Sequence, residues 1–356
     1  MAYSFWEFAK FSVRQEEVFR EALIGLAELR SSGSFLLLTQ PGPMNRATLL
    51  PATLILPGRT HEIINMRGAR FCYELCMNST QPDTPTQPIR LIALDLDGTL
   101  LRSDKTIGRR TIEALHAAHK KGVEIVLASG RMTPAMESTV DLLGLDVFLV
   151  SYNGAVISAP RGEARRKLFH SPLPADVARD LYAFARAHKY QVNFYHEDVI
   201  LTEDAPHLRP WVDLYRNRNG SPFRFVDSLE NYLHHSPTKL LLVTEPETRN
   251  RLLKEMAPNY ASRSCMVCSD PEYLEFLSVD VCKGRGVKRL AELRGIPLEA
   301  VMGVGDGDND LTMVRMSGWG VAVGNAGPQC RAAARVTTAR DHDNDAVAEA
   351  VERWVL

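Results

Sequence analysis

The 356-residue sequence has no long hydrophobic run and almost no excess of charge of either sign. Its apolar segments, such as 123–128, are far shorter than the roughly 18 consecutive apolar residues of a membrane-spanning helix. The 42 basic and 43 acidic residues nearly cancel, so no overall field draws the chain to nucleic acid or to an anionic membrane. These absences predict a soluble protein whose partner is a small molecule, with no nucleic-acid and no membrane partner.

Cysteine is scarce as well. Six cysteines in 356 residues are too few for a dense disulfide framework. Cys265 and Cys268 are spaced as a redox or zinc pair, but no second pair has zinc-site spacing and their segment is strand-like, so we expect buried thiols. The first thirty residues contain five glutamates, which argues against a secretory or transit peptide. We therefore expect a cytoplasmic protein.

Residues 1–89 differ from the rest of the chain. Apolar residues recur every three or four positions over 5–30, which predicts an amphipathic helix. The polar, proline-rich stretch 78–88 is typical of a linker and predicts a domain boundary. The extension 1–89 is either a docking module or a poorly ordered extension or upstream mis-assigned start, with Met77 as a conceivable initiator. We favour the second interpretation.

From residue 90 onward, predicted strands and helices alternate as in a parallel α/β sheet. The expected strands are 91–95, 123–129, 147–151, 301–305 and 320–323; the expected helices are 106–121 with Thr106 as its cap, one after Thr133, one after Lys283, one from about 309, and 345–354. Segment 172–280 has mixed character, with strands expected at 191–195, 239–244 and 273–277. We predict a Rossmann-like parallel-sheet core, 90–171 and 281–356, interrupted by an inserted α+β cap domain, 172–280.

Two carboxylates lie at the end of the first core strand, in the segment Asp95-Leu96-Asp97-Gly98-Thr99. Alternation along an extended strand would send Asp95 and Asp97 to the same side, and ligands of parallel sheets bind beyond the carboxyl ends of strands. One acid can attack phosphorus while the second donates a proton to the leaving alcohol and later activates water. The alternative is a pair of surface turn acids, because Asp-Gly is common in turns.

Two further elements suit a phosphoryl group. Ser129, Gly130 and Arg131 follow the next strand, where a hydroxyl and backbone N–H groups can hold phosphoryl oxygens. Arg131 is open to two interpretations, a phosphate contact or a solvated surface residue. Lys283 opens a predicted helix, where its ammonium can neutralise a nucleophilic carboxylate and the transferring phosphoryl group.

An acidic cluster, Asp306 to Asp310, directly follows the strand 301–305. Clustered hard oxygen ligands suit Mg²⁺. An EF-hand calcium loop is excluded, because counting from Asp306 the sixth position is Leu311 instead of glycine and the twelfth is Ser317 instead of glutamate.

These four elements, in this order and each at a strand end or helix start, resemble the haloacid dehalogenase superfamily, in particular its Cof-type sugar-phosphatase branch, over about residues 90–356. Asn153 and Gly154, after the third strand, also match that branch. The resemblance implies a cap that closes over the site and selects the leaving group.

The resemblance also implies residue roles. Asp95 would be the nucleophile, Asp97 the general acid/base with its backbone carbonyl on Mg²⁺, and Lys283 the charge stabiliser. Ser129, Gly130, Arg131, Asn153 and Asn309 would bind the phosphate or substrate. Asp95, Asp97, Asp306 and Asp310 would hold Mg²⁺.

The expected activity is Mg²⁺-dependent hydrolysis of small phosphorylated metabolites, such as sugar phosphates, through an aspartyl-phosphate. Two alternatives stay open: a phosphosugar mutase that returns the phosphoryl group to another hydroxyl, and a non-catalytic phosphometabolite-binding scaffold. A scaffold would not require both Asp95 and Asp97.

Overall fold

The computed structural model of the chain describes residues 36–39, 52–55, 84–161, 165–219 and 223–356. The chain forms two compact units, 1–81 and 82–356. In the first unit, β1 (Leu36–Thr39) pairs antiparallel with β2 (Ala52–Ile55). The expected helix over 5–30, Met77 and most of the expected linker lie outside the described residues. None of the described helices is both long and apolar enough to cross a membrane.

The second unit contains an eight-stranded sheet in the order β16-β15-β14-β3-β4-β5-β6-β7. The six strands from β16 to β5 are parallel, and β6 and β7 extend the sheet antiparallel. Their bounds are β3 (Leu91–Leu94), β4 (Glu124–Ala128), β5 (Phe148–Ser151), β6 (Val156–Ser158), β7 (Lys167–His170), β14 (Val301–Gly305), β15 (Trp319–Ala322) and β16 (Val336–Thr337). Because β3 lies between β4 and β14, the strand order reverses at its carboxyl end, where such sheets bind ligands.

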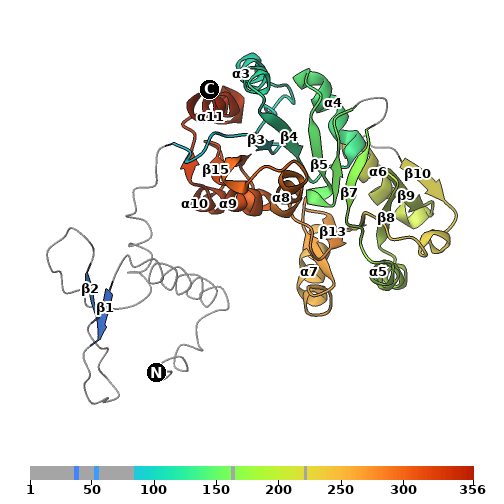
Figure 1. Ribbon diagram of the computed structural model, residues 1–356. Coiled ribbons are helices and arrows are strands. Elements are labelled where there is room, and N and C mark those ends of the chain that lie inside the picture. Colours follow the sequence, from blue (N-terminus) through green and yellow to red (C-terminus); the bar gives the residue numbers. More distant parts are fainter. Residues whose placement is uncertain (1–35, 40–51, 56–83, 162–164, 220–222) are drawn as a thin grey trace. The chain divides into compact units, whose positions relative to one another are not determined.

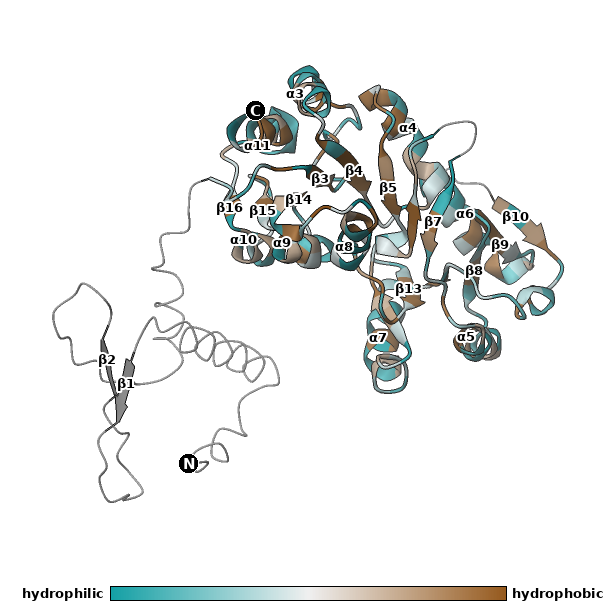
Figure 2. Cartoon of the chain, viewed as in Figure 1, coloured by the Kyte–Doolittle hydropathy of each residue, from teal (hydrophilic) through white to brown (hydrophobic). Residues whose placement is uncertain are grey.

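Helices cover both faces of this sheet (Figure 1). Ile92 and Leu94 of β3 pack with α3 (Arg109–Lys120), α4 (Thr133–Leu143) and α11 (Ala346–Trp354). Leu91 and Ala93, which point to the opposite face, pack with α8 (Lys283–Leu293) and α9 (Leu311–Met316), while α10 (Pro328–Ala333) lies beside α9. With both faces covered, the central strands are continuously hydrophobic (Figure 2).

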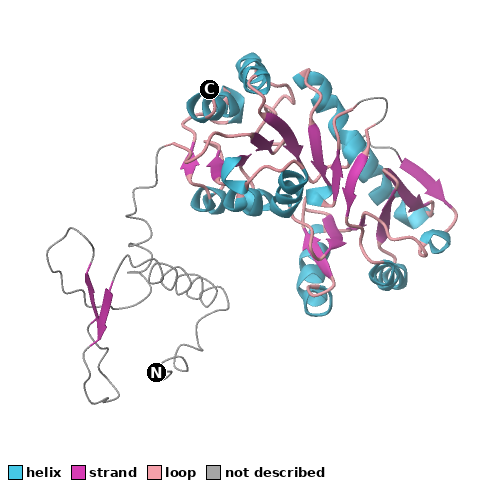
Figure 3. Cartoon of the chain, in the orientation of Figure 1, coloured by secondary structure: helices cyan, strands magenta, loops and turns pink. Residues whose placement is uncertain are grey.

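A second sheet, the cap sheet, is built from residues 191–278 in the order β10-β9-β8-β11-β13-β12 (Figure 3). Its apolar face, with Phe194, Leu240 and Phe276, packs against α5 (Ala175–His188) and α7 (Pro246–Tyr260). Its other face packs with α6 (Arg209–Asn219) and with core residues such as Tyr152. The strands are β8 (Gln191–His196), β9 (Val199–Glu203), β10 (Phe223–Val226), β11 (Lys239–Val243), β12 (Ser264–Val267) and β13 (Tyr273–Ser278).

The structure confirms the α/β fold class with a parallel-sheet core, and each predicted strand after residue 90 is present within two residues of its expected bounds. The predicted cap of the first core helix is wrong. The helix begins at Arg109 after Gly108, while the Thr106 hydroxyl donates to Asp104 instead. The short strands β6, β7, β9, β10 and β16 were not predicted from the sequence, whereas β12 coincides with the strand-like segment expected around Cys265. The domain bounds 172 and 280 remain a prediction.

Candidate active site

The predicted site residues gather at the carboxyl edge of the parallel sheet. Asp95 follows β3, Ser129 follows β4 and Asp306 follows β14, and parallel neighbouring strands end at the same edge. They line a cleft of about 1380 Å³ whose other walls come from α4 of the core and from the cap sheet and α6. Asp97, Gly130, Arg131, Asn153, Lys283 and Asn309 also line this cleft.

Lys283 connects the two halves of the core. It is the first residue of α8, and its side chain has no exposed surface. The ammonium donates to Oδ1 of Asp95 at 2.5 Å and to Oδ1 of Asp310 at 2.7 Å. Burial alone would lower the pKa of Lys283, but the two carboxylates outweigh it and the net pKa is raised. Lys283 is therefore a buried, charged bridge between two acids.

Asp95 is the most strongly perturbed carboxyl of the site. Burial raises its pKa to about 8, Lys283 opposes the rise, and the neighbouring Asp310 and Asp306 add to it. Only one of its oxygens is bonded to Lys283. Asp95 is thus a buried carboxylate whose second oxygen is not bonded to Lys283.

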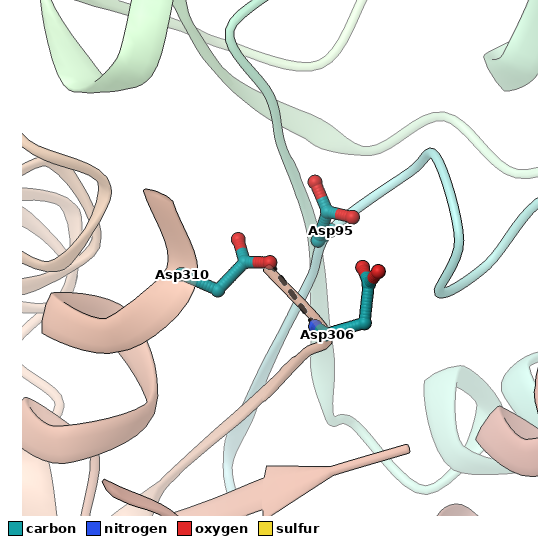
Figure 4. Close-up of side chains that lie close together, drawn as sticks. All are labelled: Asp95, Asp306 and Asp310. Atoms are coloured by element: carbon teal, nitrogen blue, oxygen red, sulfur yellow. Dashed lines mark hydrogen bonds between the residues drawn. The ribbon is translucent and has the colours of Figure 1, made fainter. Parts of the chain in front are cut away.

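Asp95, Asp306 and Asp310 form a cluster of three carboxylates whose oxygens lie within 4.8 Å of one another (Figure 4). Asp310 is held by the backbone N–H groups of Asp306 and Gly307, which donate to its Oδ2 at 3.1 and 3.0 Å. The Thr99 hydroxyl donates to Oδ1 of Asp306 at 2.8 Å. Burial raises the pKa of Asp306, Thr99 opposes this, and Asp310 adds to it. Three crowded hard-oxygen donors fit a divalent cation.

The Asp97 carboxylate lies outside this cluster of three. β3 ends at Leu94 and a turn follows, so the argument from strand alternation is wrong, although Asp95 and Asp97 line the same cleft. Asp97 accepts from Lys105 Nζ at 2.9 Å and from Arg131 Nε at 2.8 Å. Burial raises its pKa, but these two cations outweigh burial and the net pKa is lowered.

The loop after β4 packs on the turn after β5. The backbone N–H of Asn153 donates to the Ser129 carbonyl at 2.9 Å, and the Arg131 N–H donates to Ser129 Oγ at 3.2 Å. Asn153 adopts a left-handed conformation (φ 55°), and its buried Oδ1 has no hydrogen-bond partner among the described residues. A Cβ on Gly130 would lie 3.0 Å from that oxygen, so glycine permits this close approach. The Arg131 side chain forms an ion pair with Asp97 inside the cleft. The sequence had left open whether this side chain contacts phosphate or lies on the surface.

Sequence reasoning missed Thr99, Lys105 and the cap residues of the cleft. Thr99 stands in the pentapeptide of Asp95, so its position was a usable signal. No sequence signal pointed to Lys105, because its contact with Asp97 depends on the fold of the intervening loop. Cys265 and Cys268 also line the cleft; they are free and half-buried instead of fully buried as expected.

Comparison with known proteins agrees with this geometry. The family model of haloacid dehalogenase-like hydrolases matches residues 92–351. The chain is 31% identical over 242 residues to the HMP-PP phosphatase of Cronobacter sakazakii, covering 67% of this chain and 86% of that protein. A haloacid dehalogenase-like hydrolase from Bacteroides thetaiotaomicron superposes with a TM-score of 0.66 at 32% identity, covering 74% of this chain and 99% of that one.

A solved sugar phosphatase of subclass IIB superposes with a TM-score of 0.61 at 25% identity, covering 74% of this chain and 98% of that one. The match therefore includes both sheets of the second unit, the core and the cap. With the family model, the fold and the relatives in agreement, the chain belongs to the haloacid dehalogenase-like hydrolases, in their Cof-type branch, as a phosphatase that acts on phosphate monoesters.

Proposed function

We propose that the protein hydrolyses small phosphomonoesters, such as sugar phosphates, with Mg²⁺ and through an aspartyl-phosphate on Asp95. The observation that carries this proposal is the position of Asp95. It is buried at the carboxyl end of β3, bonded to Lys283 through one oxygen, and beside Asp306 and Asp310 in a cleft that cap residues also line.

The donor set favours a division of roles around the metal. Both oxygens of Asp310 are engaged, one by Lys283 and the other by two backbone N–H groups. Asp306 keeps an oxygen that these groups do not use, and the Lys283-bonded oxygen of Asp95 keeps a second lone-pair site, so we assign Asp95 and Asp306 as direct ligands and Asp310 as their support. Bound Mg²⁺ would neutralise charge on the phosphoryl oxygens.

The protein's own groups then supply the chemistry. The second oxygen of Asp95 attacks phosphorus, the ester P–O bond breaks, and the leaving alcohol oxygen takes a proton from the Asp97 carboxyl. Asp97 next removes a proton from water, whose oxygen attacks the phosphorus of the aspartyl-phosphate and releases phosphate and the Asp95 carboxylate. Ser129 Oγ and the nearby backbone N–H groups are placed to hold the phosphoryl oxygens, and Lys283 offsets charge on Asp95.

Arg131 and Lys105 connect this acid/base role to substrate entry. Both cations now bind Asp97 and lower its pKa, which disfavours the protonated form that donates to a leaving group. A phosphate dianion entering the cleft competes for these cations. Their transfer to the phosphate would raise the pKa of Asp97 at the moment when a proton donor is needed.

The relatives support a small leaving group. One is an HMP-PP phosphatase and another is a sugar phosphatase. The cleft volume of about 1380 Å³ is enough for such a metabolite between core and cap.

The test is release of inorganic phosphate from a panel of phosphometabolites, with MgCl₂ or with EDTA. Asp95→Asn should lower kcat at least about 1,000-fold, because it removes the nucleophile. Asp227→Asn, an exposed cap acid outside the cleft, is the matched control and should leave the rate unchanged. Full activity of Asp95→Asn would refute the nucleophile assignment. Ester phosphate moving to another hydroxyl, without inorganic phosphate, would favour the mutase.

A further inference from the structure

A buried ion pair lies on the cap side of the active-site cleft. Lys239 on β11 and Glu275 on β13 each have side chains that are 5% exposed, and Lys239 Nζ donates to Oε1 of Glu275 at 2.9 Å. Both residues line the cleft. The proposed reaction uses neither of them.

The backbone sets the direction of this pair. Glu275 lies opposite Leu241 in the β11–β13 ladder, and Lys239 is two residues before Leu241, so all three occupy one face of the cap sheet. Leu241 packs in the same cluster as Met132 and Tyr152 of the core. The pair therefore faces the core instead of α5 and α7, which cover the apolar face.

Half of the Glu275 carboxylate has no partner. Oε1 accepts from Lys239 and, at 2.7 Å, from the Ser269 hydroxyl, whereas the buried Oε2 has no hydrogen-bond partner among the described residues. A buried carboxylate oxygen left without a donor is costly. Because Glu275 lines the cleft, a bound molecule can supply that donor.

Stability does not account for this arrangement. Replacing a buried ion pair by apolar residues of similar volume is often neutral or stabilising, so the stability of the cap alone does not require this pair. Lys239 Nζ also lies 4.6 Å from the centre of the Tyr195 ring, which gives the ammonium a second favourable contact and an aromatic wall beside it.

We propose that Glu275 and Lys239 form the cap's recognition site for an uncharged, polyhydroxylated leaving group. This inference rests on the proposed phosphatase function and names its specificity determinants. A hydroxyl both donates and accepts, so it can donate to Glu275 Oε2 and accept from Lys239. An ammonium group would be repelled by Lys239 and a carboxylate by Glu275.

The first experiment uses the unmodified protein. With Mg²⁺ present, kcat/KM is measured for two matched pairs, erythritol 4-phosphate against butyl phosphate and sorbitol 6-phosphate against hexyl phosphate, with p-nitrophenyl phosphate as reference. In at least one pair the polyol ester should be favoured by about 10- to 100-fold, because an ester without hydroxyls leaves the buried carboxylate unpaired.

The second experiment removes the pair. The double variant Lys239→Met/Glu275→Leu should lose this preference while p-nitrophenyl phosphate hydrolysis stays within about threefold, since the pair touches only the leaving group. The matched control is Lys254→Met/Glu255→Leu, two exposed neighbours on the outer helix α7, which should keep the preference. Circular dichroism checks that each variant is folded.

The outcomes are distinguishable. Hydrolysis of p-nitrophenyl phosphate with no polyol preference in either pair would overturn this inference alone, even if the double variant failed to fold. A preference that persists in a folded Lys239→Met/Glu275→Leu variant would overturn it as well. Failure of the unmodified protein to hydrolyse any of these esters would overturn the proposed phosphatase function, and this inference with it.

Discussion

Replacement of Lys283 by methionine is the sharpest test of the electrostatic description of the site. Methionine keeps the length and apolar stem of lysine but removes the ammonium that bonds Asp95 and Asp310. These two carboxylates have side-chain exposures of 7% and 1%, so water cannot replace the lost partner. Removing one member of a buried ion pair costs about 3–5 kcal/mol, a large share of the about 5–15 kcal/mol that stabilises a typical protein.

The assay measures the urea unfolding of the wild type, Lys283→Met and Lys288→Met, with circular dichroism as the signal. Lys288 is exposed on the same helix, so its replacement should change the free energy of unfolding by less than about 0.5 kcal/mol. On the folded fraction of Lys283→Met, hydrolysis of p-nitrophenyl phosphate should fall at least about 100-fold, because the charge that offsets Asp95 is gone.

A second variant separates charge from packing. Lys283→Met/Asp310→Asn removes one of the unpaired carboxylates, so part of the lost stability should return while activity stays low. If Lys283→Met cost less than about 1 kcal/mol, or no more than Lys288→Met, the description of Lys283 as the partner that stabilises these buried acids would be refuted.

Three further predictions concern the surroundings of this ion pair. Gly154→Ala should lower the free energy of unfolding by more than about 2 kcal/mol, because Gly154 has φ +103° and a Cβ there would lie 2.4 Å from the Cys282 carbonyl oxygen. Gly122→Ala, at φ +86° with open space around it, should cost only about 1 kcal/mol in the same urea experiment, and equal losses would contradict the steric explanation. Thr99→Val should raise the MgCl₂ concentration for half-maximal activity about 10-fold, since the hydroxyl holds Asp306 at 2.8 Å; an unchanged titration curve would argue against that role. Removal of divalent cations by EDTA should abolish hydrolysis and added MgCl₂ should restore it, whereas full activity in EDTA would rule out the metal dependence.

Much of the core could be predicted because its strands carry their own signal. Strands buried on both faces are continuous apolar runs, as in 301–305, and their bounds follow from local composition. The cap was harder. β10 is only four residues long and mostly solvent-exposed, so it lacks such a run, and its place beside β9 comes from pairing.

The site residues also fall into a group that the sequence predicts and a group that it does not. Asp95, Ser129 and Asp306 were predictable because each follows a recognisable strand, and strand ends in a parallel sheet meet at one edge. The separation of Asp97 from the three-carboxylate cluster was not predictable, because it depends on where β3 stops and on the positions of Lys105 and Arg131.

The sequence by itself determined the fold class, the family resemblance and the set of chemical groups, since these depend on short segments and their order along the chain. Tertiary structure alone decided which groups meet. Lys283 lies 188 residues from Asp95 in the sequence, yet the two are bonded because β3 pairs with β14 and α8 packs on that sheet. It also decided that Lys239 and Glu275 face the cleft, because the direction of a strand side chain is fixed only when the sheet packs against its neighbours.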